Sequence, residues 1–249
     1  MKFLKLKIKF KFLPVLLLLN SCSGDFNNKC FDDIGNVTTE IRTFDNIYTI
    51  MVYGVYDLFI QKDTTNYAEI ESSENLIPLI KTELRDAILY ISDDINCKWS
   101  REYKRNKITL HLKDIHQIMV FESCNIRSVN TLQFWDFFIN IRADLAESSV
   151  DIDCERFKFW GSYTTSGKNI ITGTTKFLEI QAYNALQVDA EDLQSKTSKI
   201  VQKSIGDMYI WIDEVVNVEM LSSGNLFIKG RPDSINIINY TGTGKILPL

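Results

Sequence analysis

The stretch FKFWGSYTTSGKNIITGTTKFLEIQAYNALQV, residues 157–188, decides the fold. It holds two apolar strands, 157–160 and 177–180, and each is followed by a polar corner and a second short apolar run, at 170–171 and 186–188. The same pattern extends in both directions along the chain. Equivalent corners lie at Ser123, Ala143, Ser162, Ala182, Ser204, Ser222 and Thr241, so the spacing between successive corners is nearly constant.

A period of roughly 20 residues predicts a parallel β-solenoid, because each coil must return to the same place one strand spacing further on. We therefore expect an all-β fold, a single-stranded, right-handed parallel β-helix built from coils of that length. At about 3.3 Å per residue, one coil has a perimeter on the order of 66 Å, enough for two or three sides around one core. The alternative is an irregular β-sandwich, which would show turns every roughly 8 to 12 residues without a common period.

Two parts are expected within residues 44–249. The first, 44–112, holds apolar or alternating runs that predict strands, with one helical turn at 74–80 that Pro78 limits. These runs cover 47–52, 55–60, 67–70, 88–91 and 107–112. The repeat coils occupy 113–249. We expect the first part to cap one end of the solenoid, and Pro232, Pro248 and Lys245 to protect the other.

The N-terminus has the layout of a signal peptide. Residues 1–21 place five lysines before an apolar run, 12–19, which is too short to span a bilayer. Ser21 before Cys22 resembles the bacterial lipobox, in which the cysteine is acylated and becomes the first residue. Residues 22–43 would then be the lipidated Cys22 and its tether. The alternative is plain secretion with cleavage elsewhere.

Charge and composition narrow the function. The chain has 28 Lys and Arg against 32 Asp and Glu, and loss of lysines 2, 5, 7, 9 and 11 with the leader would leave 23 against 32. A mature domain this acidic is a poor nucleic-acid binder. The only two histidines, His111 and His116, are five positions apart, so on one continuous strand they would point to opposite faces and could not share a metal. We expect no metal site and no cofactor.

Four cysteines remain besides Cys22. An exported chain permits disulfides, and we favour a bond between Cys30, near the tether, and Cys97, in a polar loop. Cys154 ends an alternating strand and is expected to be a small buried side chain. The sequence leaves open whether Cys124 and Cys154 are free.

The chain has none of the short motifs of hydrolases, nucleotide-binding proteins or metalloproteases, so no catalytic residue is assigned. Asp151 and Asp153 share one strand face at a spacing that suits a cation or acid-base chemistry. Neighbouring coils offer no further acids to complete such a site, and we interpret the pair as part of a solvated strand face.

Aromatic side chains are the stronger indication of a ligand site. Tyr163 and Tyr183 fall one coil apart at the same corner, with Trp160 just before the first, so these rings could line one ridge. Flat aromatic surfaces suit sugars and peptides. An aromatic ladder that only packs the coils is the alternative. Trp135, Trp211 and Tyr209 are expected to serve packing.

Several stretches resemble a bacterial family of auto-transporter adhesins with a head GIN domain, a domain of unknown function. The similarity covers nearly all of residues 44–249, with corners of the family's Ser-Gly type at 204–207, 222–225 and 241–244. The stretches that carry it earlier in the chain are 44–47, 52–55, 68–76, 80–84 and 89–91, and the closing segment is 230–235. The corners at 122–125, 143–146 and 182–185 lack the glycines of the pattern, so tight turns with positive φ cannot be assumed there. The resemblance implies a stacked β-solenoid and an envelope-facing role.

These observations predict an exported protein anchored through acylated Cys22 to the bacterial outer membrane, on its periplasmic face or at the cell surface. Its solenoid would act as an adhesin or binding module for a polysaccharide or for an envelope or host protein. The alternatives are a carbohydrate-active enzyme on the same scaffold and a structural or signalling envelope component.

Overall fold

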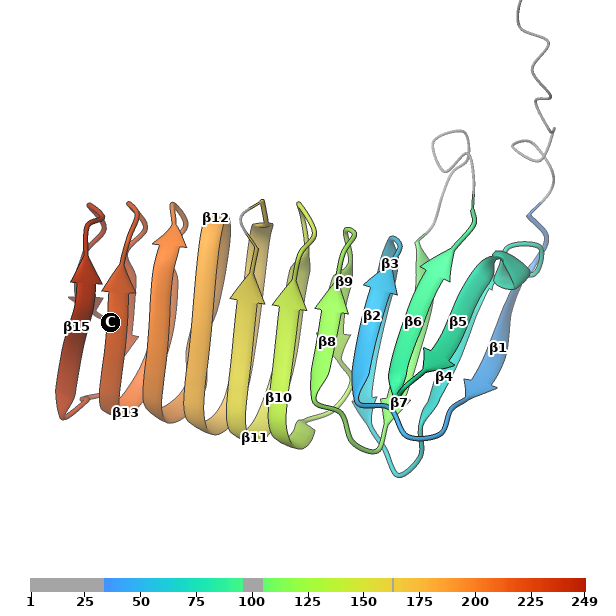
Figure 1. Ribbon diagram of the computed structural model, residues 1–249, viewed down its shortest axis with the longest axis horizontal. Helices are drawn as coiled ribbons and strands as arrows, with labels where there is room; N and C mark the ends of the chain where they lie inside the picture. The colour runs from blue at the N-terminus through green and yellow to red at the C-terminus, as the bar shows by residue number, and fades with distance from the viewer. Residues whose placement is uncertain (1–33, 96–104, 163) are drawn as a thin grey trace, which may run out of the picture. The chain divides into compact units, whose positions relative to one another are not determined.

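The computed structural model describes residues 34–95, 105–162 and 164–249. Four predicted site residues, Cys22, Cys30, Cys97 and Tyr163, lie outside them. Strands account for 70% of the described residues, and the curled sheet completes about six turns of a β-solenoid (Figure 1). The expected solenoid is confirmed. One hydrophobic core runs through these residues, with buried members from Ile47 to Ile228, so the described unit carries its own core.

The strands of the first part agree with all five expected runs and add two, β1 and β5. They are β1 Val37–Thr43, β2 Thr49–Tyr53, β3 Tyr56–Lys62, β4 Tyr67–Ser73, β5 Ile80–Arg85, β6 Ile88–Asp93 and β7 Asn106–Leu112, with one 3-10 turn, η3 Ile77–Leu79. The coils contain β8 Gln117–Val120, β9 Asn125–Ser128, β10 Leu132–Ile141, β11 Glu147–Gly161, β12 Ser166–Ser204, β13 Met208–Met220, β14 Leu226–Lys229, β15 Ser234–Tyr240 and β16 Ile246–Pro248.

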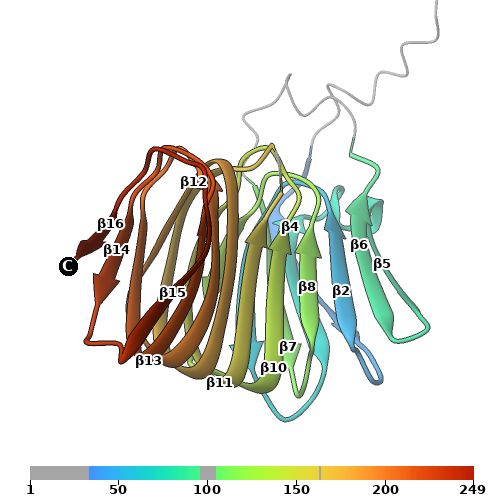
Figure 2. The same ribbon diagram turned by 60° about the vertical axis from the view of Figure 1, so that its left-hand side comes forward.

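Parallel pairing at the predicted period holds the coils together. Phe137 lies in register with Phe157, and Phe157 with Leu178, so side chains one coil apart in the sequence form columns through the core. The long strands bend: the first half of β11 pairs with β9 and its second half with β10. Each coil therefore contributes to two sides of the solenoid, which Figure 2 shows as a front and a rear layer.

Alternation along each strand explains why these residues take this fold. In β13, Met208, Ile210 and Ile212 are fully buried, whereas Tyr209 and Trp211 between them face outward and are half-buried. A period of two positions places one apolar set inside the coil and leaves the other set for the surface. Tyr209 stacks on Phe227 of the next coil, with ring centroids 4.8 Å apart, as expected for a packing residue.

The corners between strands depend on particular residues for two different reasons. Asn184, in a corner without glycine, takes a positive φ of 56°, a conformation that asparagine tolerates better than most residues. Gly224 in a later corner is needed for a different reason: a Cβ there would lie 2.2 Å from the carbonyl oxygen of Gly206 in the coil below. Close stacking of coils, rather than a left-handed turn, selects that glycine.

The N-terminal end is closed by antiparallel strands. β1 pairs with β4, β4 with β7, and β5 with β6, whereas β2 and β3 already stack in parallel on β8 and β9. Stacking thus begins before residue 113, and β1 lies within the stretch expected to be tether. Arg42 of β1 crosses to the β5 side, where its guanidinium donates to the carbonyls of Ile80 (2.7 Å) and Ile77 (3.3 Å).

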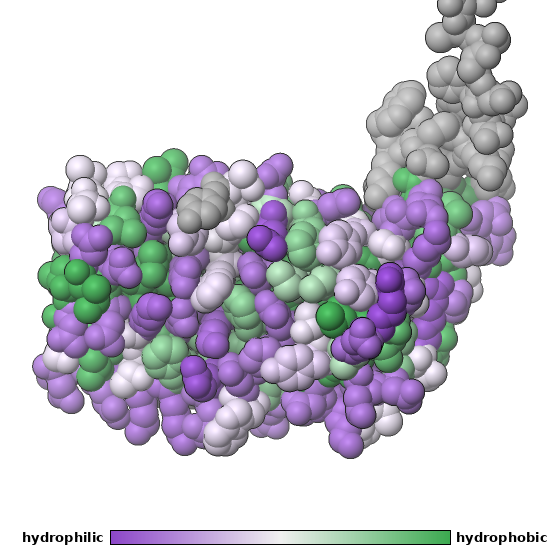
Figure 3. Space-filling model, in the orientation of Figure 1, coloured by the Kyte–Doolittle hydropathy of each residue, from purple (hydrophilic) through white to green (hydrophobic). Residues whose placement is uncertain are grey.

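The C-terminal end differs from the expected cap. Pro248 lies in β16 and pairs with Ile228 of β14, but β15 leaves apolar side chains uncovered. Its side chains Ile235, Ile237, Ile238 and Tyr240 are 44%, 56%, 66% and 47% exposed. Figure 3 shows hydrophobic side chains at the end of the solenoid that Figure 1 labels β15.

Candidate functional site

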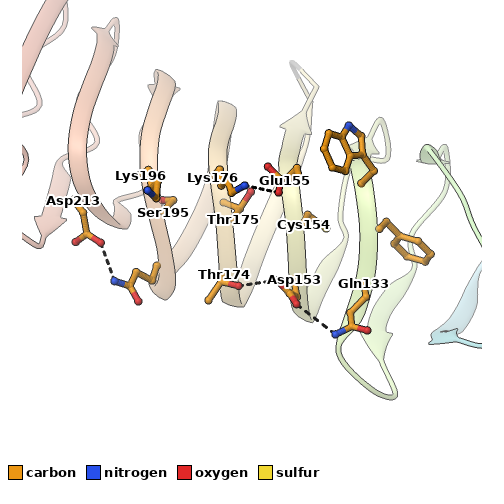
Figure 4. A pocket seen from close by; sticks show the side chains of 13 residues that line it. Gln133, Asp153, Cys154, Glu155, Thr174, Thr175, Lys176, Ser195, Lys196 and Asp213 are labelled. Carbon is orange, nitrogen blue, oxygen red and sulfur yellow. Dashed lines mark hydrogen bonds and ion pairs between the residues drawn. The ribbon is translucent and has the colours of Figure 1, made fainter.

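A groove of about 570 Å³ follows the bend where each coil turns from one side of the solenoid to the other. It crosses successive coils, so it is built from strand segments that lie side by side in space and one coil apart in the sequence (Figure 4). We call this the bend groove. Its lining residues are Gln133, Phe134, Trp135, Asp153, Cys154, Glu155, Thr174, Thr175, Lys176, Gln194, Ser195, Lys196 and Asp213.

Trp135 is the most prominent side chain of the bend groove. It is 72% exposed, although its neighbours Phe134 and Phe137 are 5% and 0% exposed. It lies on β10 at the bend, and the alternation from buried Leu132 and Phe134 directs Gln133 and Trp135 outward. The expectation that Trp135 serves packing is therefore wrong. The same alternation could have identified it from the sequence.

A second hollow, of about 290 Å³, borders Trp135 away from the bend groove. Its wall includes Tyr48 and His116, whose rings are stacked with centroids 4.9 Å apart, and Asp136. His116 Nδ1 lies 3.9 Å from the Asp136 carboxylate. The Trp135 ring thus stands between two concave surfaces, and a ligand could reach it from either one.

Polar side chains of the bend groove are joined from coil to coil. Thr174 donates to Asp153 (3.0 Å), and Gln133 donates to the other oxygen of the same carboxylate (3.4 Å). The ammonium of Lys176 lies 2.6 Å from Glu155. These contacts fix the side chains in rows across the groove, and Figure 4 shows them as dashed lines.

The carboxylates at the bend are held by lateral partners. Asp213 accepts from Gln194 (2.8 Å) and from the indole N–H of Trp211 (3.0 Å). Asp151, the neighbour of Asp153 on the same face, accepts from Thr131 (2.5 Å) and Thr172 (3.0 Å). Asp151 and Asp153 thus belong to hydrogen-bonded ladders on an accessible strand face. Among the described residues, no group of three or more His, Cys, Asp or Glu side chains is arranged to hold a metal.

Chemically, the bend groove combines one exposed aromatic face with ordered donors and acceptors. Gln133, Thr174 and Gln194 offer amides and hydroxyls, and Lys176 and Lys196 offer ammonium groups. A flat ring flanked by fixed polar groups suits a ligand with both apolar faces and many hydroxyls.

The predicted aromatic ridge is only partly within the described residues. Trp160 lies in register with Gln181, and Tyr183 follows two positions later on the same face, with its hydroxyl 3.5 Å from Gln181. Both rings are half-buried. Trp160 packs edge-on against Phe138 (centroids 4.8 Å apart), and the ammonium of Lys203 lies 5.6 Å from the Tyr183 ring centre. As a ligand site, this ridge stays a prediction.

The described cysteines are buried thiols. Cys124 is 0% exposed and Cys154 is 6% exposed, and both are free. Burial raises the pKa of each thiol to about 11, because the thiolate would lose its hydration. The expectation for Cys154 as a small buried side chain is confirmed. The lipid site Cys22 and the disulfide between Cys30 and Cys97 stay predictions, since they lie outside the described residues.

The two histidines have separate surroundings. His111 is 6% exposed, and its Nδ1 lies 2.9 Å from Asp63. Its ring stacks on Tyr67 at 3.9 Å. The hydrogen bond from His111 lowers the pKa of the Asp63 carboxyl. His111 of β7 thus contacts Tyr67 of β4 and Asp63, the residue that follows β3, whereas His116 belongs to the hollow beside Trp135.

Comparisons with known proteins agree with this architecture. The family model described as "Putative auto-transporter adhesin, head GIN domain" matches residues 46–232. No curated protein sequence matches the chain. Within the described part of the chain, no helix has the length and apolar character needed to cross a membrane.

Solved structures share the fold at low sequence identity. A "putative adhesin" from Bacteroides fragilis has a TM-score of 0.75 and 17% identity, covering 86% of this chain and 97% of that one. A "putative adhesin" from Parabacteroides distasonis has a TM-score of 0.63 and 16% identity, with 86% and 98% covered. A "putative lipid binding protein" from the same species has a TM-score of 0.62 and 18% identity, with 86% and 97% covered. Because the family model spans most of the chain, this protein belongs to the family of auto-transporter adhesins with a head GIN domain.

Proposed function

We propose that this protein is a lipid-anchored adhesin of the bacterial cell envelope that binds carbohydrate in the bend groove, with Trp135 as the stacking platform. It acts as a binding module rather than an enzyme. Membership of an adhesin family supports an envelope or surface location. The family does not specify a ligand, so the proposal for carbohydrate rests on the groove.

The single observation that carries the proposal is the exposure of Trp135. A tryptophan that is 72% exposed presents a large, flat apolar face to water, and tryptophan rings are enriched at interaction surfaces because they combine an apolar face with a polar N–H. Here the surrounding groups are the fixed amides, hydroxyls and ammonium groups of several coils. Sugars present this mixture of apolar ring faces and hydroxyls, so the groove matches them better than a purely apolar ligand.

Binding is tested with the soluble chain from Ser23 to Leu249, which includes every described residue. The protein is titrated against a panel of purified polysaccharides and oligosaccharides, and Trp135→Ala is compared with the unaltered chain. We expect saturable binding to at least one glycan class and a loss of about tenfold or more in affinity in the variant, equal to about 1.4 kcal/mol. Circular dichroism and thermal unfolding check that the variant keeps its fold.

Tyr183→Ala is the matched control, because it removes an aromatic ring from the predicted ridge instead of the groove. Loss of binding in Trp135→Ala alone supports the groove, whereas loss in Tyr183→Ala alone moves the site to the ridge. If a folded protein binds no glycan, the carbohydrate proposal is wrong, and protein ligands become the better candidates. Release of smaller saccharides from the panel would instead show a carbohydrate-active enzyme.

The anchor is tested separately in the native host. Cells fed a fatty acid with an alkyne tag are fractionated, and the protein is examined for label. We expect label and membrane association in the unaltered chain and neither in Cys22→Ala. A labelled Cys22→Ala protein, or an unlabelled secreted one with Cys22 present, would contradict anchoring at this residue.

A further inference from the structure

The last coil presents an open strand edge. β15 pairs with β13 on one side, and β16 pairs with β14 on one side; within the described residues, neither has a strand on its other side. Every second backbone N–H and C=O of such an edge is available to another strand. The length of β15, Ser234–Tyr240, gives this edge room for several backbone hydrogen bonds to a partner strand.

The exposed side chains of β15 continue the core. Ile235 is in register with Val216, and Ile237 with Val218, and both valines are 0% exposed. Ile235 and Ile237 therefore point toward the place where a further coil would supply its own core, yet they are 44% and 56% exposed. Covering them would remove apolar surface from water, which favours association.

The charge pattern of this edge permits self-pairing. Ser234–Tyr240 reads SINIINY and contains no charged residue. Soluble proteins commonly place charges on an exposed edge to prevent pairing with another chain. Two copies of a neutral strand can approach without like charges facing each other, which would otherwise destabilise the pair.

Among the described residues, the opposite end of the solenoid is charged. The outermost strands there, β1 and β5, carry Glu40, Arg42, Lys81, Glu83 and Arg85. Arg42 also fills the space between them with a charged group. Stacking of one copy's C-terminal end on another copy's N-terminal end would bury these charges, so an open filament is disfavoured.

From these observations we infer that the C-terminal end is a self-association surface, through which two copies of this chain pair tail to tail. β15 of one copy runs antiparallel to β15 of the other, about a twofold axis. A second copy supplies the same cross-section, the same apolar side chains and the same neutral edge. Because one patch pairs with itself, the assembly closes at two copies.

The test is the mass of the soluble chain, Ser23 to Leu249, measured by sedimentation equilibrium across a concentration series. We expect a reversible monomer–dimer equilibrium with no larger species. Ile237→Lys places an ammonium group in the contact and should weaken dimerisation by about tenfold or more, since burying an unpaired charge is costly. Ile238→Lys, at the 66% exposed neighbour, gives an independent second variant if Ile237→Lys does not fold.

Two variants control for added charge at other places. Ile205→Lys alters a 66% exposed isoleucine in a corner, and Ile41→Lys alters a 62% exposed isoleucine of β1. Both should dimerise as the unaltered chain does. A monomer at all concentrations, a dimer lost in Ile41→Lys but kept in Ile237→Lys, or growth beyond two copies would overturn the inference.

Discussion

The two ends of the solenoid differ in how their outermost strands are protected from pairing with another chain. At the N-terminal end, antiparallel strands turn the chain back, and Arg42 donates to two carbonyls across the gap between β1 and β5. At the C-terminal end, the parallel stack stops, and core-facing isoleucines of β15 remain accessible. β1 also exposes Val37 and Ile41, but these alternate with Glu40 and Arg42.

This difference indicates that the side chains at each end, and not the solenoid fold itself, decide whether an edge strand is protected from pairing with another chain. Charges on β1 and β5 oppose the addition of another strand. The neutral, apolar β15 has no such protection, which makes it suited to one particular partner surface. If the uncharged end is the one that associates, the contact joins two identical patches, and such an assembly closes at two copies instead of growing into fibres.

The largest predicted effect is a difference in stability between two positions of one core column. One position lies in the middle of the solenoid and the other in its last coil. Ile200, Val218 and Ile237 are successive members of one column. Ile200 is 0% exposed, so Ile200→Ala should lower the free energy of unfolding by about 2–5 kcal/mol through lost burial and a cavity.

Ile237→Ala is the matched variant, and in dilute protein it should cost less than about 1 kcal/mol, because the side chain is already half in water. Urea unfolding of both variants provides the measurement. Equal costs would mean that the last coil is buried, and the contrast between the middle and the end would fail.

The second prediction concerns the charge that closes the N-terminal end. Arg42→Met keeps most of the side-chain length but removes the donors to Ile77 and Ile80. We expect a loss of about 2 kcal/mol, because hydrogen bonds from a charged donor are stronger than neutral ones.

Arg85→Met on β5 is the control. Arg85 is paired with Glu83 at the surface, with both side chains about 60% exposed, and such pairs contribute less than about 1 kcal/mol. Chemical denaturation compares the two variants. If Arg85→Met costs as much as Arg42→Met, the bridging role of Arg42 is not supported.

The smallest predicted effect is a pH dependence confined to the N-terminal part. The hydrogen bond from His111 lowers the pKa of Asp63 below its ordinary value of 3.8. A lowered folded-state pKa gives stability that is present above the unfolded value and is lost as the pH falls through the folded value. The difference in unfolding free energy between the unaltered chain and Asp63→Asn should therefore shrink as the pH falls below about 4.

Asp233→Asn, at an exposed carboxylate of the last coil, is the control for this titration. Denaturation at a series of pH values measures both variants. A difference for Asp63→Asn that grows as the solution is acidified would have the wrong sign for a carboxyl stabilised in its charged form.

The sequence predicted the coils because a solenoid repeats its contacts at a fixed period. Phe157 and Leu178 are one repeat apart in the sequence and in register in space, so the period of the sequence was enough to predict their pairing. The first part could not be read in this way. β1 pairs with β4, and Arg42 reaches Ile80, only after strands far apart in sequence have found each other.

The bend groove was missed for a related reason. Trp135 lies in an aromatic run, which favoured an interpretation as core, although the alternation with buried Leu132 and Phe134 directs it outward. The groove itself forms across successive coils, so no short motif records it. Aromatic content led to the hypothesis of a ligand surface, but the position of the bend groove depends on the stacking of the coils.

Hydrogen exchange measured by mass spectrometry, at low and high protein concentration, tests the contrast between the ends most directly. We predict that the amides of β15 exchange more slowly at high concentration, because a second copy then pairs with this edge. The amides of β1 and β5 should exchange at the same rate throughout. Exchange in β15 that does not change with concentration, or protection that appears at β1 and β5 instead, would contradict the assignment of the open end.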